Sequence, residues 1–183
     1  MYMTTFTNNL YSILTIVAQI IIVLSVFAYF WGKGGELEAF FLEHGKKHGF
    51  LLSFVVASLA MIGSLTYSDV LGYEPCKLCW YQRIFMYPLV VLFAMALRRN
   101  DKSIRPYAIA MTLFGGFIAL DHYFLQLTGV SVLPCSAVGY SVSCAKNFVL
   151  QYGYITIPLM ALSAFGLILV ALLWNKRAER LGK

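Results

Sequence analysis

LYSILTIVAQIIIVLSVFAYFW, residues 10–31, is a run of 22 residues without a charged side chain. A helix rises 1.5 Å per residue, so this run is long enough to cross the roughly 30 Å hydrocarbon layer of a membrane. Residues 1–9 carry no Lys or Arg, and no small-residue cleavage site follows the run. A signal peptide would have a basic start and a shorter apolar core, so we expect a retained transmembrane helix.

Four more apolar segments follow, at residues 50–67, 81–97, 107–127 and 154–174. Many of their ends carry Tyr or Trp, which favour the headgroup level of a membrane. Hydrophobic residues make up 60% of the 183-residue chain and charged residues only 12%, against about 25% in an average soluble protein. These features exclude an ordinary soluble domain, a disordered chain and a coiled coil. They predict an all-α integral membrane bundle of five helices.

The basic residues predict how this bundle is oriented. Of 14 Lys and Arg residues, eleven follow the first, third and fifth segments and so lie on one side of the membrane. Only Lys77, Arg83 and Lys146 belong to the other side. By the positive-inside rule, the side with eleven cations is cytoplasmic, and so is the C-terminal tail. These cations account for the basic charge through topology and contacts with membrane lipid, so no nucleic acid partner is expected.

All four cysteines belong to the predicted extracytoplasmic side. Cys76 and Cys79 precede the third segment, and Cys135 and Cys144 lie in the loop before the fifth. Disulfides persist on that side of a cell membrane. Loop lengths favour Cys76–Cys79 and Cys135–Cys144 as resting pairs, although four cysteines allow three connectivities.

The sequence PCKLCW, residues 75–80, is a C-x-x-C motif at the start of a predicted helix. The free N–H groups of a helix start stabilise a thiolate, and Lys77 adds positive charge. We therefore expect a redox-active pair, with a structural disulfide or a metal half-site as the alternatives. Zinc would require a second short pair or histidine ligands, whereas eight residues separate Cys135 from Cys144. A thiol–disulfide exchange relay between the two pairs accounts for both the C-x-x-C motif and the Cys135–Cys144 pair.

Three polar residues inside the apolar segments are candidates for a second part of the site. Arg83 follows Cys79 by one helical turn, and Asp121 and His122 lie at a similar depth in the fourth segment. Either Asp121 neutralises Arg83 inside the bundle, or His122 serves a polar pocket as donor or proton relay. The chain has no haem, flavin or nucleotide motif. A lipid-soluble quinone is therefore the expected electron acceptor.

Two further segments have local predictions. Residues 147–152 are expected to form a short amphipathic turn on the membrane, tethering the second cysteine loop near the C-x-x-C motif. A site-directed probe scan should then show faster lipid-exposed labelling at Phe148 than at Ser141. Residues 36–43 are expected to belong to a linker, with an interfacial amphipathic turn as the alternative.

The motifs together resemble those of one family, the DsbB/BdbC disulfide bond formation proteins, and especially its compact BdbC-type branch. The resemblance covers residues 50–174 and rests on PCKLCWYQR (75–83), MYP (86–88), His122-Tyr123, Pro134-Cys135, Cys144 and YITIP (154–158). It implies a DsbB-like four-helix core in a bacterial cell membrane. The implied activity is the reoxidation of an extracytoplasmic thioredoxin-fold thiol oxidase, DsbA/BdbD-like, coupled to reduction of ubiquinone or menaquinone.

The resemblance also implies a role for each site residue. Cys135 would form the mixed disulfide with the partner and Cys144 would resolve it. Cys76 and Cys79 would then receive the electrons, with a Cys79 thiolate facing the quinone. Arg83 and His122 match residues of the family's quinone site.

The chain divides into a first helix with its linker (1–49), the redox domain (50–174) and a basic tail (175–183). The additional N-terminal transmembrane helix is a departure from the four-helix pattern. A vitamin K epoxide reductase-like enzyme would normally carry its C-x-x-C motif late in the helical core, whereas here the motif comes early. A non-enzymatic membrane protein with structural disulfides is the other alternative.

Overall fold

The protein is a bundle of five long helices in a computed structural model that describes residues 2–31, 34–133, 135 and 143–182. The helices are α1 (Tyr2–Phe30), α2 (Glu36–Leu65), α3 (Lys77–Arg99), α4 (Arg105–Thr128) and α5 (Ile157–Arg180), and a π-helical turn, η1 (Thr66–Val70), extends α2. All five are long and apolar enough to cross a membrane. Among the described residues no strand forms beyond one isolated bridge, Gln151 to Ile155. The predicted helical membrane bundle is confirmed.

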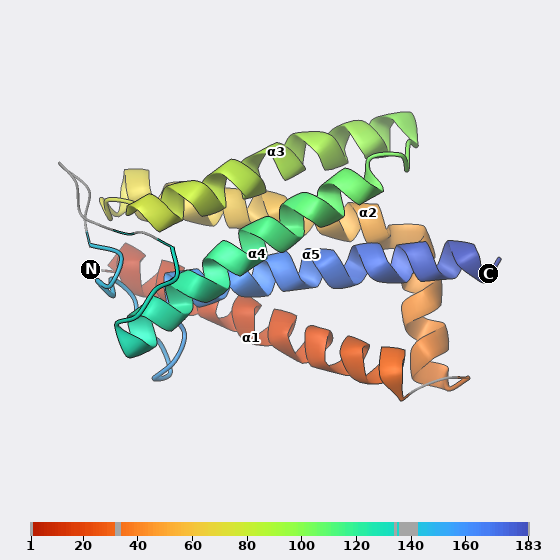
Figure 1. The fold of residues 1–183 in the computed structure, drawn as a ribbon, viewed down its shortest axis with the longest axis horizontal. Coiled ribbons are helices and arrows are strands. Elements are labelled where there is room, and N and C mark those ends of the chain that lie inside the picture. Colours follow the sequence, from red (N-terminus) through yellow and green to blue (C-terminus); the bar gives the residue numbers. More distant parts are fainter. Residues whose placement is uncertain (1, 32–33, 134, 136–142, 183) are drawn as a thin grey trace.

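Four of the helices enclose one apolar core. α2 packs on α3 and α5, and α4 packs on α3 and α5, which closes a ring of contacts. Phe93 of α3 and Phe165 and Ile168 of α5 are fully buried at its centre. α4 approaches α5 closely at Gly115, where an added Cβ would lie 2.3 Å from the Phe165 ring. α1 lies outside this ring, mainly against α5 (Figure 1).

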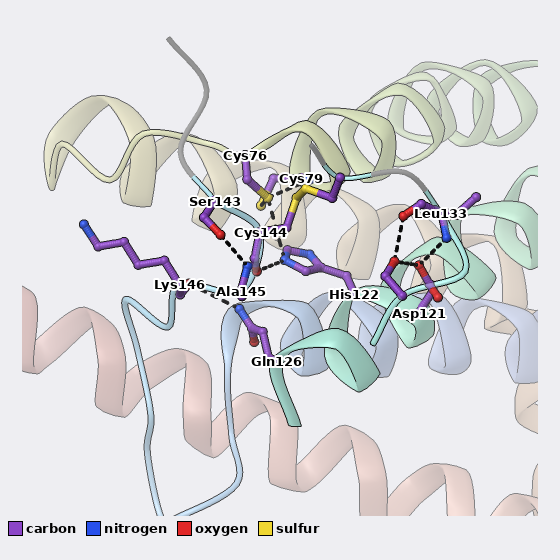
Figure 2. Close-up of a disulfide and its surroundings, with 12 residues drawn as sticks. Cys76, Cys79, Asp121, His122, Gln126, Leu133, Ser143, Cys144, Ala145 and Lys146 are labelled. Carbon is purple, nitrogen blue, oxygen red and sulfur yellow. Dashed lines mark hydrogen bonds between the residues drawn. A yellow bond between two sulfur atoms is a disulfide. The ribbon is translucent and has the colours of Figure 1, made fainter. Parts of the chain in front are cut away.

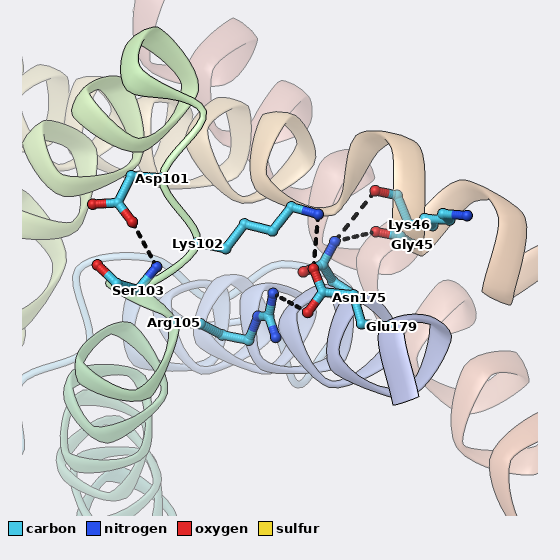
Figure 3. Close-up of polar contacts among 8 residues, drawn as sticks. All are labelled: Gly45, Lys46, Asp101, Lys102, Ser103, Arg105, Asn175 and Glu179. Atoms are coloured by element: carbon cyan, nitrogen blue, oxygen red, sulfur yellow. Dashed lines mark hydrogen bonds and ion pairs between the residues drawn. The ribbon is translucent and has the colours of Figure 1, made fainter. Parts of the chain in front are cut away.

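The start of α2 differs from the prediction. Residues 36–49 are not a linker or an isolated turn, because α2 begins at Glu36 and continues to Leu65. Its first turns lie against α5, where an added Cβ at Gly45 would be 2.8 Å from that of Trp174. Asn175 of α5 donates from Nδ2 to the Gly45 carbonyl oxygen at 2.9 Å (Figure 3). This close packing keeps a charged segment helical and attached to the bundle.

The connections between helices differ at the two ends of the bundle. One end, the cysteine end, carries the loops with the four cysteines, and the chain's last residues lie at the other end (Figure 1). At that opposite end the Glu179 carboxylate pairs with Lys102 and Arg105, each at 2.7 Å (Figure 3). Glu38 of α2 pairs with Arg177 of α5. Ion pairs therefore tie the α3–α4 connection and the start of α2 to α5, away from the cysteines.

Candidate redox site

The C-x-x-C motif forms the first turn of α3. Cys76 is the N-cap residue with an extended backbone, and the backbone N–H of Cys79 donates to its sulfur at 3.4 Å. The helix begins at Lys77, four residues before the predicted segment, because a cysteine sulfur can satisfy a free N–H as a capping group. Both cysteines consequently lie at the positive end of the helix dipole.

The structure has the two cysteine pairs that loop length favours. Cys135 and Cys144 form a disulfide with their Cα atoms 6.2 Å apart. Cys76 and Cys79 are thiols with their sulfur atoms 3.1 Å apart. Leu78 and Leu125 help bury Cys76 and Cys144 in one apolar cluster, against which Cys79 and Cys135 also pack. The two pairs are therefore neighbours in a site shielded from water.

His122 contacts both pairs from α4. Its Nε2 lies 3.0 Å from the Cys144 carbonyl oxygen and 3.7 Å from the Cys76 sulfur (Figure 2). Its Nδ1 lies 3.0 Å from Nε2 of Gln82. A carbonyl oxygen only accepts and an amide NH₂ only donates, which assigns the ring hydrogen to Nε2. His122 thus donates between the two cysteine pairs while Gln82 holds the other side of its ring.

Gln82 was not predicted as a site residue from the sequence. It is buried on α3, one turn after Cys79. The available signal was an uncharged polar side chain inside an apolar segment, placed on the same helix face as a reactive cysteine. That signal identifies the position of Gln82 on its helix. It does not identify the partner, His122, which belongs to α4.

These contacts favour a thiolate at Cys76. The hydrogen bond donated by the Cys79 thiol lowers the pKa of Cys76 most, and the contacts with His122 and the Cys79 backbone N–H lower it further against the effect of burial. The family resemblance implied a Cys79 thiolate. In this redox state the donors converge on Cys76 instead, and Cys79 is one of them.

Arg83 and Asp121 do not pair, so of the two alternatives, the one in which Asp121 neutralises Arg83 is excluded. Arg83 donates from Nε to the Ser64 hydroxyl at 2.9 Å and from Nη2 to the Ser64 carbonyl oxygen at 3.0 Å. The Asp121 carboxylate accepts from the Ser131 hydroxyl at 2.7 Å and from the Val132 N–H at 2.8 Å. It also accepts from the next backbone N–H at 3.3 Å. Asp121 therefore binds the start of the loop that carries Cys135, whereas Arg83 binds Ser64 of α2.

The segment after Cys144 packs by ring stacking on the residues that precede the C-x-x-C motif. The Phe148 ring stacks on Tyr73, three residues before Cys76, with the ring centres 5.0 Å apart. Residues 147–152 form no helix: 147–150 are irregular with one bend, and Gln151 is bridged to Ile155. Ser141, the other half of the labelling prediction, lies outside the described residues, as does Pro134 of the resemblance.

A cavity of about 330 Å³ reaches the C-x-x-C motif from the interior of the bundle. Cys79, Arg83 and Tyr87 of α3 line it together with apolar residues of α1, α2 and α5. A second cavity, of about 50 Å³, lies on the loop side and is lined by Cys76, His122, Cys79 and Arg83 among others. Cys79 thus lies between the cluster of Cys76 and His122 and a cavity whose size and apolar walls suit a small molecule.

The same cluster has some features of a metal site. One ligand atom each from Cys76, Cys79 and His122 lies within 4.8 Å of the others. Structural zinc takes four protein ligands, and among the described residues this cluster supplies three.

Comparison with known proteins agrees with this geometry. The sequence model of the family described as "Disulfide bond formation protein DsbB" matches residues 46–175. Disulfide bond formation protein C of Bacillus subtilis (strain 168) is 41% identical over 131 residues, which cover 69% of this chain and 93% of that relative.

Two further relatives give the same result. SPbeta prophage-derived disulfide bond formation protein B of Bacillus subtilis (strain 168) is 39% identical over 122 residues, 67% of this chain and 81% of the relative. A probable disulfide formation protein of Oceanobacillus iheyensis is 42% identical over 120 residues, 66% of this chain and 83% of the relative. No solved structure matches the chain. The chain belongs to the DsbB family of disulfide bond formation proteins, on its BdbC-like branch, and thereby to the membrane disulfide oxidases.

Proposed function

We propose that this protein reoxidises the dithiol of an extracytoplasmic thioredoxin-fold thiol oxidase, of the DsbA/BdbD kind, and passes the electrons to a membrane quinone. The observation that carries the proposal is the position of Cys76 and Cys79. Cys76 meets His122 and the buried Cys144 on one side, and Cys79 lines a large apolar cavity on the other. Electrons that enter through the loop disulfide then have a short path into the membrane interior.

The first exchange takes place at Cys135–Cys144. A thiolate of the partner attacks the Cys135 sulfur, the bond to Cys144 breaks, and Cys144 leaves as a thiolate. The partner's second thiol, and not Cys144 as the resemblance implied, then breaks the mixed disulfide, because attack by Cys144 would return the starting disulfide and a reduced partner. The partner leaves oxidised, and Cys135 and Cys144 hold its two electrons as a dithiol. The half-buried Cys135 is the more accessible sulfur, because Cys144 is only 1% exposed.

The second exchange moves the electrons to the C-x-x-C pair. The Cys144 thiolate attacks Cys76 of a Cys76–Cys79 disulfide, and Cys79 is released towards the cavity. Cys135 then attacks Cys144, which restores the loop disulfide and releases Cys76. The products are a Cys135–Cys144 disulfide, a Cys76 thiolate held by His122 and a Cys79 thiol that donates to it. The same disulfide is present in the structure, where the Cys76 sulfur lies 3.1 Å from that of Cys79 and 3.7 Å from His122 Nε2, as this state requires.

The residues around Cys79 fit a quinone. Arg83 presents a guanidinium at the cavity wall, held by two hydrogen bonds to Ser64, and Tyr87 donates to the same hydroxyl at 3.2 Å. A guanidinium donates to carbonyl oxygens, and the apolar walls suit a lipid-soluble molecule. When bound, a quinone would accept two electrons as the Cys76–Cys79 disulfide forms, with one proton from the Cys79 thiol and the second from water, because Cys76 is already a thiolate. Arg83 would orient it and Cys79 would face it.

The orientation belongs to the same proposal. The cysteine end would face away from the cytoplasm, where the partner is found, and the ion-paired opposite end with the C-terminus would face the cytoplasm of a bacterial cell. Cysteine accessibility to a membrane-impermeant thiol reagent in intact cells tests this orientation.

The activity is tested with purified protein, a reduced thioredoxin-fold oxidase, and either ubiquinone or menaquinone. We expect quinone reduction in step with oxidation of the partner. Cys79→Ser should abolish it, and Cys135→Ser should abolish it with the partner as donor. Undiminished turnover in Cys79→Ser would overturn the proposed path. Thiols that never reoxidise after quinone addition would indicate structural disulfides, and electron flow from quinol to the partner would indicate a reductase.

A further inference from the structure

α1 lies outside the residues matched by the family, yet it is attached to the core along its length. The family match begins at residue 46, and alignment to the Bacillus subtilis protein leaves less than a tenth of that relative unmatched. Nearest the cysteine end, Tyr11 packs on Gly63, where an added Cβ would be 2.5 Å from its ring. At mid-helix, Gln19 donates to the Ser163 hydroxyl at 3.3 Å. These contacts hold α1 in one rotation against α2 and α5.

In that rotation one face of α1 lines the 330 Å³ cavity. Tyr11, Leu14, Ala18 and Ile21 follow the three- and four-residue spacing of a single helix face, and all four line the cavity. Within the described residues α1 and α3 make no direct helix contact, although both contribute to its walls. The cavity therefore occupies the space between α1 and the helix that carries Cys79.

The cavity is polar at one end and aliphatic at the other. Its polar end, formed by Cys79, Arg83 and Ser64, lies at the cysteine end of the bundle. Its aliphatic end is formed by Ile21, Leu52 and Leu167. Leu52 and Ser64 are twelve residues apart on α2, a separation of about 18 Å along a helix. This elongated shape matches a molecule with a redox head and a hydrocarbon tail.

We infer that α1 is the wall of the quinone site that receives the isoprenoid tail. This inference rests on the proposed function and adds a part of the chain beyond the matched family region. α1 provides an aliphatic surface opposite α2 and α5, so that the tail is enclosed by protein between helices. Binding of quinones should therefore depend on tail length more strongly than it would if the tail lay in lipid.

Two adjacent isoleucines of α1 provide a matched test. Ile21 lines the cavity, whereas Ile20 is 54% exposed on the outer surface and does not line it. Ile21→Trp should fill the aliphatic end, and Ile20→Trp adds the same side chain outside it. We expect Ile21→Trp to raise the KM for long-tail quinones about tenfold, with little change for tailless benzoquinone and naphthoquinone analogues. Ile20→Trp should behave as wild type with both.

A binding measurement complements the kinetics. The quinone that remains bound after purification, quantified by chromatography and mass spectrometry, should fall about tenfold in Ile21→Trp and remain unchanged in Ile20→Trp. Ala18→Leu is a milder filling variant at a second cavity position and covers the case in which Ile21→Trp does not fold. It should give the same dependence on tail length.

The outcomes separate the two proposals. If the wild-type protein neither binds nor reduces any quinone, the proposed function fails. If wild type does both, and Ile21→Trp and Ala18→Leu match Ile20→Trp for long and tailless quinones alike, the role of α1 is overturned. An equal loss for long and tailless quinones also overturns it, because filling the aliphatic end should spare the head.

Discussion

The Nε2 atom of His122 lies 3.0 Å from the carbonyl oxygen of Cys144, which places a ring from α4 against a residue of the loop disulfide. The same nitrogen is 3.7 Å from the sulfur of Cys76. A single N–H is thus shared between Cys144, which would deliver electrons in the proposed relay, and Cys76, which would receive them. The properties of Cys76 should accordingly depend on His122.

His122→Phe should raise the pKa of Cys76, because it removes a donor to the thiolate while keeping a ring in the buried site. The pKa of Cys76 lies below the ordinary thiol value of 9.0, mainly through the hydrogen bond from Cys79 and further through His122. In wild type, alkylation of Cys76 by iodoacetamide should therefore remain fast from alkaline to neutral pH. An ordinary thiol loses about tenfold in rate per pH unit below its pKa. In His122→Phe the fall should begin at a higher pH.

The readout is the alkylation rate of Cys76 in the reduced protein, followed by mass spectrometry across pH. His48→Phe is the matched control, since His48 lies on α2 outside the redox cluster. Superimposable pH profiles for wild type and His122→Phe would remove His122 from the stabilisation of the thiolate.

Arg83→Gln should raise the KM for quinone about tenfold or more and change the KM for the partner little. A hydrogen bond from a charged group contributes about 1.5–3 kcal/mol, and about 1.4 kcal/mol is a factor of ten. Ser64→Ala should have a smaller effect in the same direction, because it removes one of two hydrogen bonds that hold the guanidinium. Steady-state kinetics with each substrate varied separately measures both. An unchanged quinone KM in Arg83→Gln would leave Arg83 as a structural anchor.

Asp121→Asn should impair exchange with the partner. Its carboxylate holds Ser131 and the N–H groups of Val132 and Leu133, shortly before Cys135. Hydrogen bonds to a buried charged group contribute about 1.5–3 kcal/mol each, so the substitution should loosen this part of the loop. We expect a lower kcat/KM for the partner and an unchanged quinone KM.

Asp101→Asn is a suitable comparison. Asp101 also accepts a backbone N–H, from Ser103 at 2.8 Å, but at the opposite end of the bundle (Figure 3). Equal effects of the two substitutions on the partner reaction would show that Asp121 acts only through overall stability.

Gly115→Ala should destabilise the bundle by about 1–3 kcal/mol, because the added methyl group overlaps the buried Phe165 ring. Gly116→Ala meets only an ordinary contact at 3.6 Å and should be neutral, or stabilising by up to about 1 kcal/mol through higher helix propensity. Thermal unfolding in the same detergent compares the two. A lower midpoint for Gly116→Ala than for Gly115→Ala would contradict the packing described for α4 on α5.

The helix class and the cysteine chemistry could be predicted from the sequence because both depend on local pattern. Apolar runs identify the membrane helices, and C-x-x-C at a helix start identifies the reactive pair. The partners of Asp121 and Gln82 could not be predicted, because they depend on how each helix is rotated in the bundle. The helical conformation of residues 36–49 was also missed. Its charged residues suggest a linker, whereas its glycines permit packing on α5 that hydropathy does not record.

The Cys135–Cys144 disulfide closes a ring with a sequence separation of only nine, in a loop outside the helices. It joins no two helices. The ion pairs of Glu179 and Glu38, by contrast, tie the α3–α4 connection and the start of α2 to α5 at the far end of the bundle. The proposed cycle breaks this covalent cross-link at every turnover, and the helices keep their arrangement because none of them relies on it. A cross-link that the scaffold does not need is one that the protein can exchange repeatedly without unfolding.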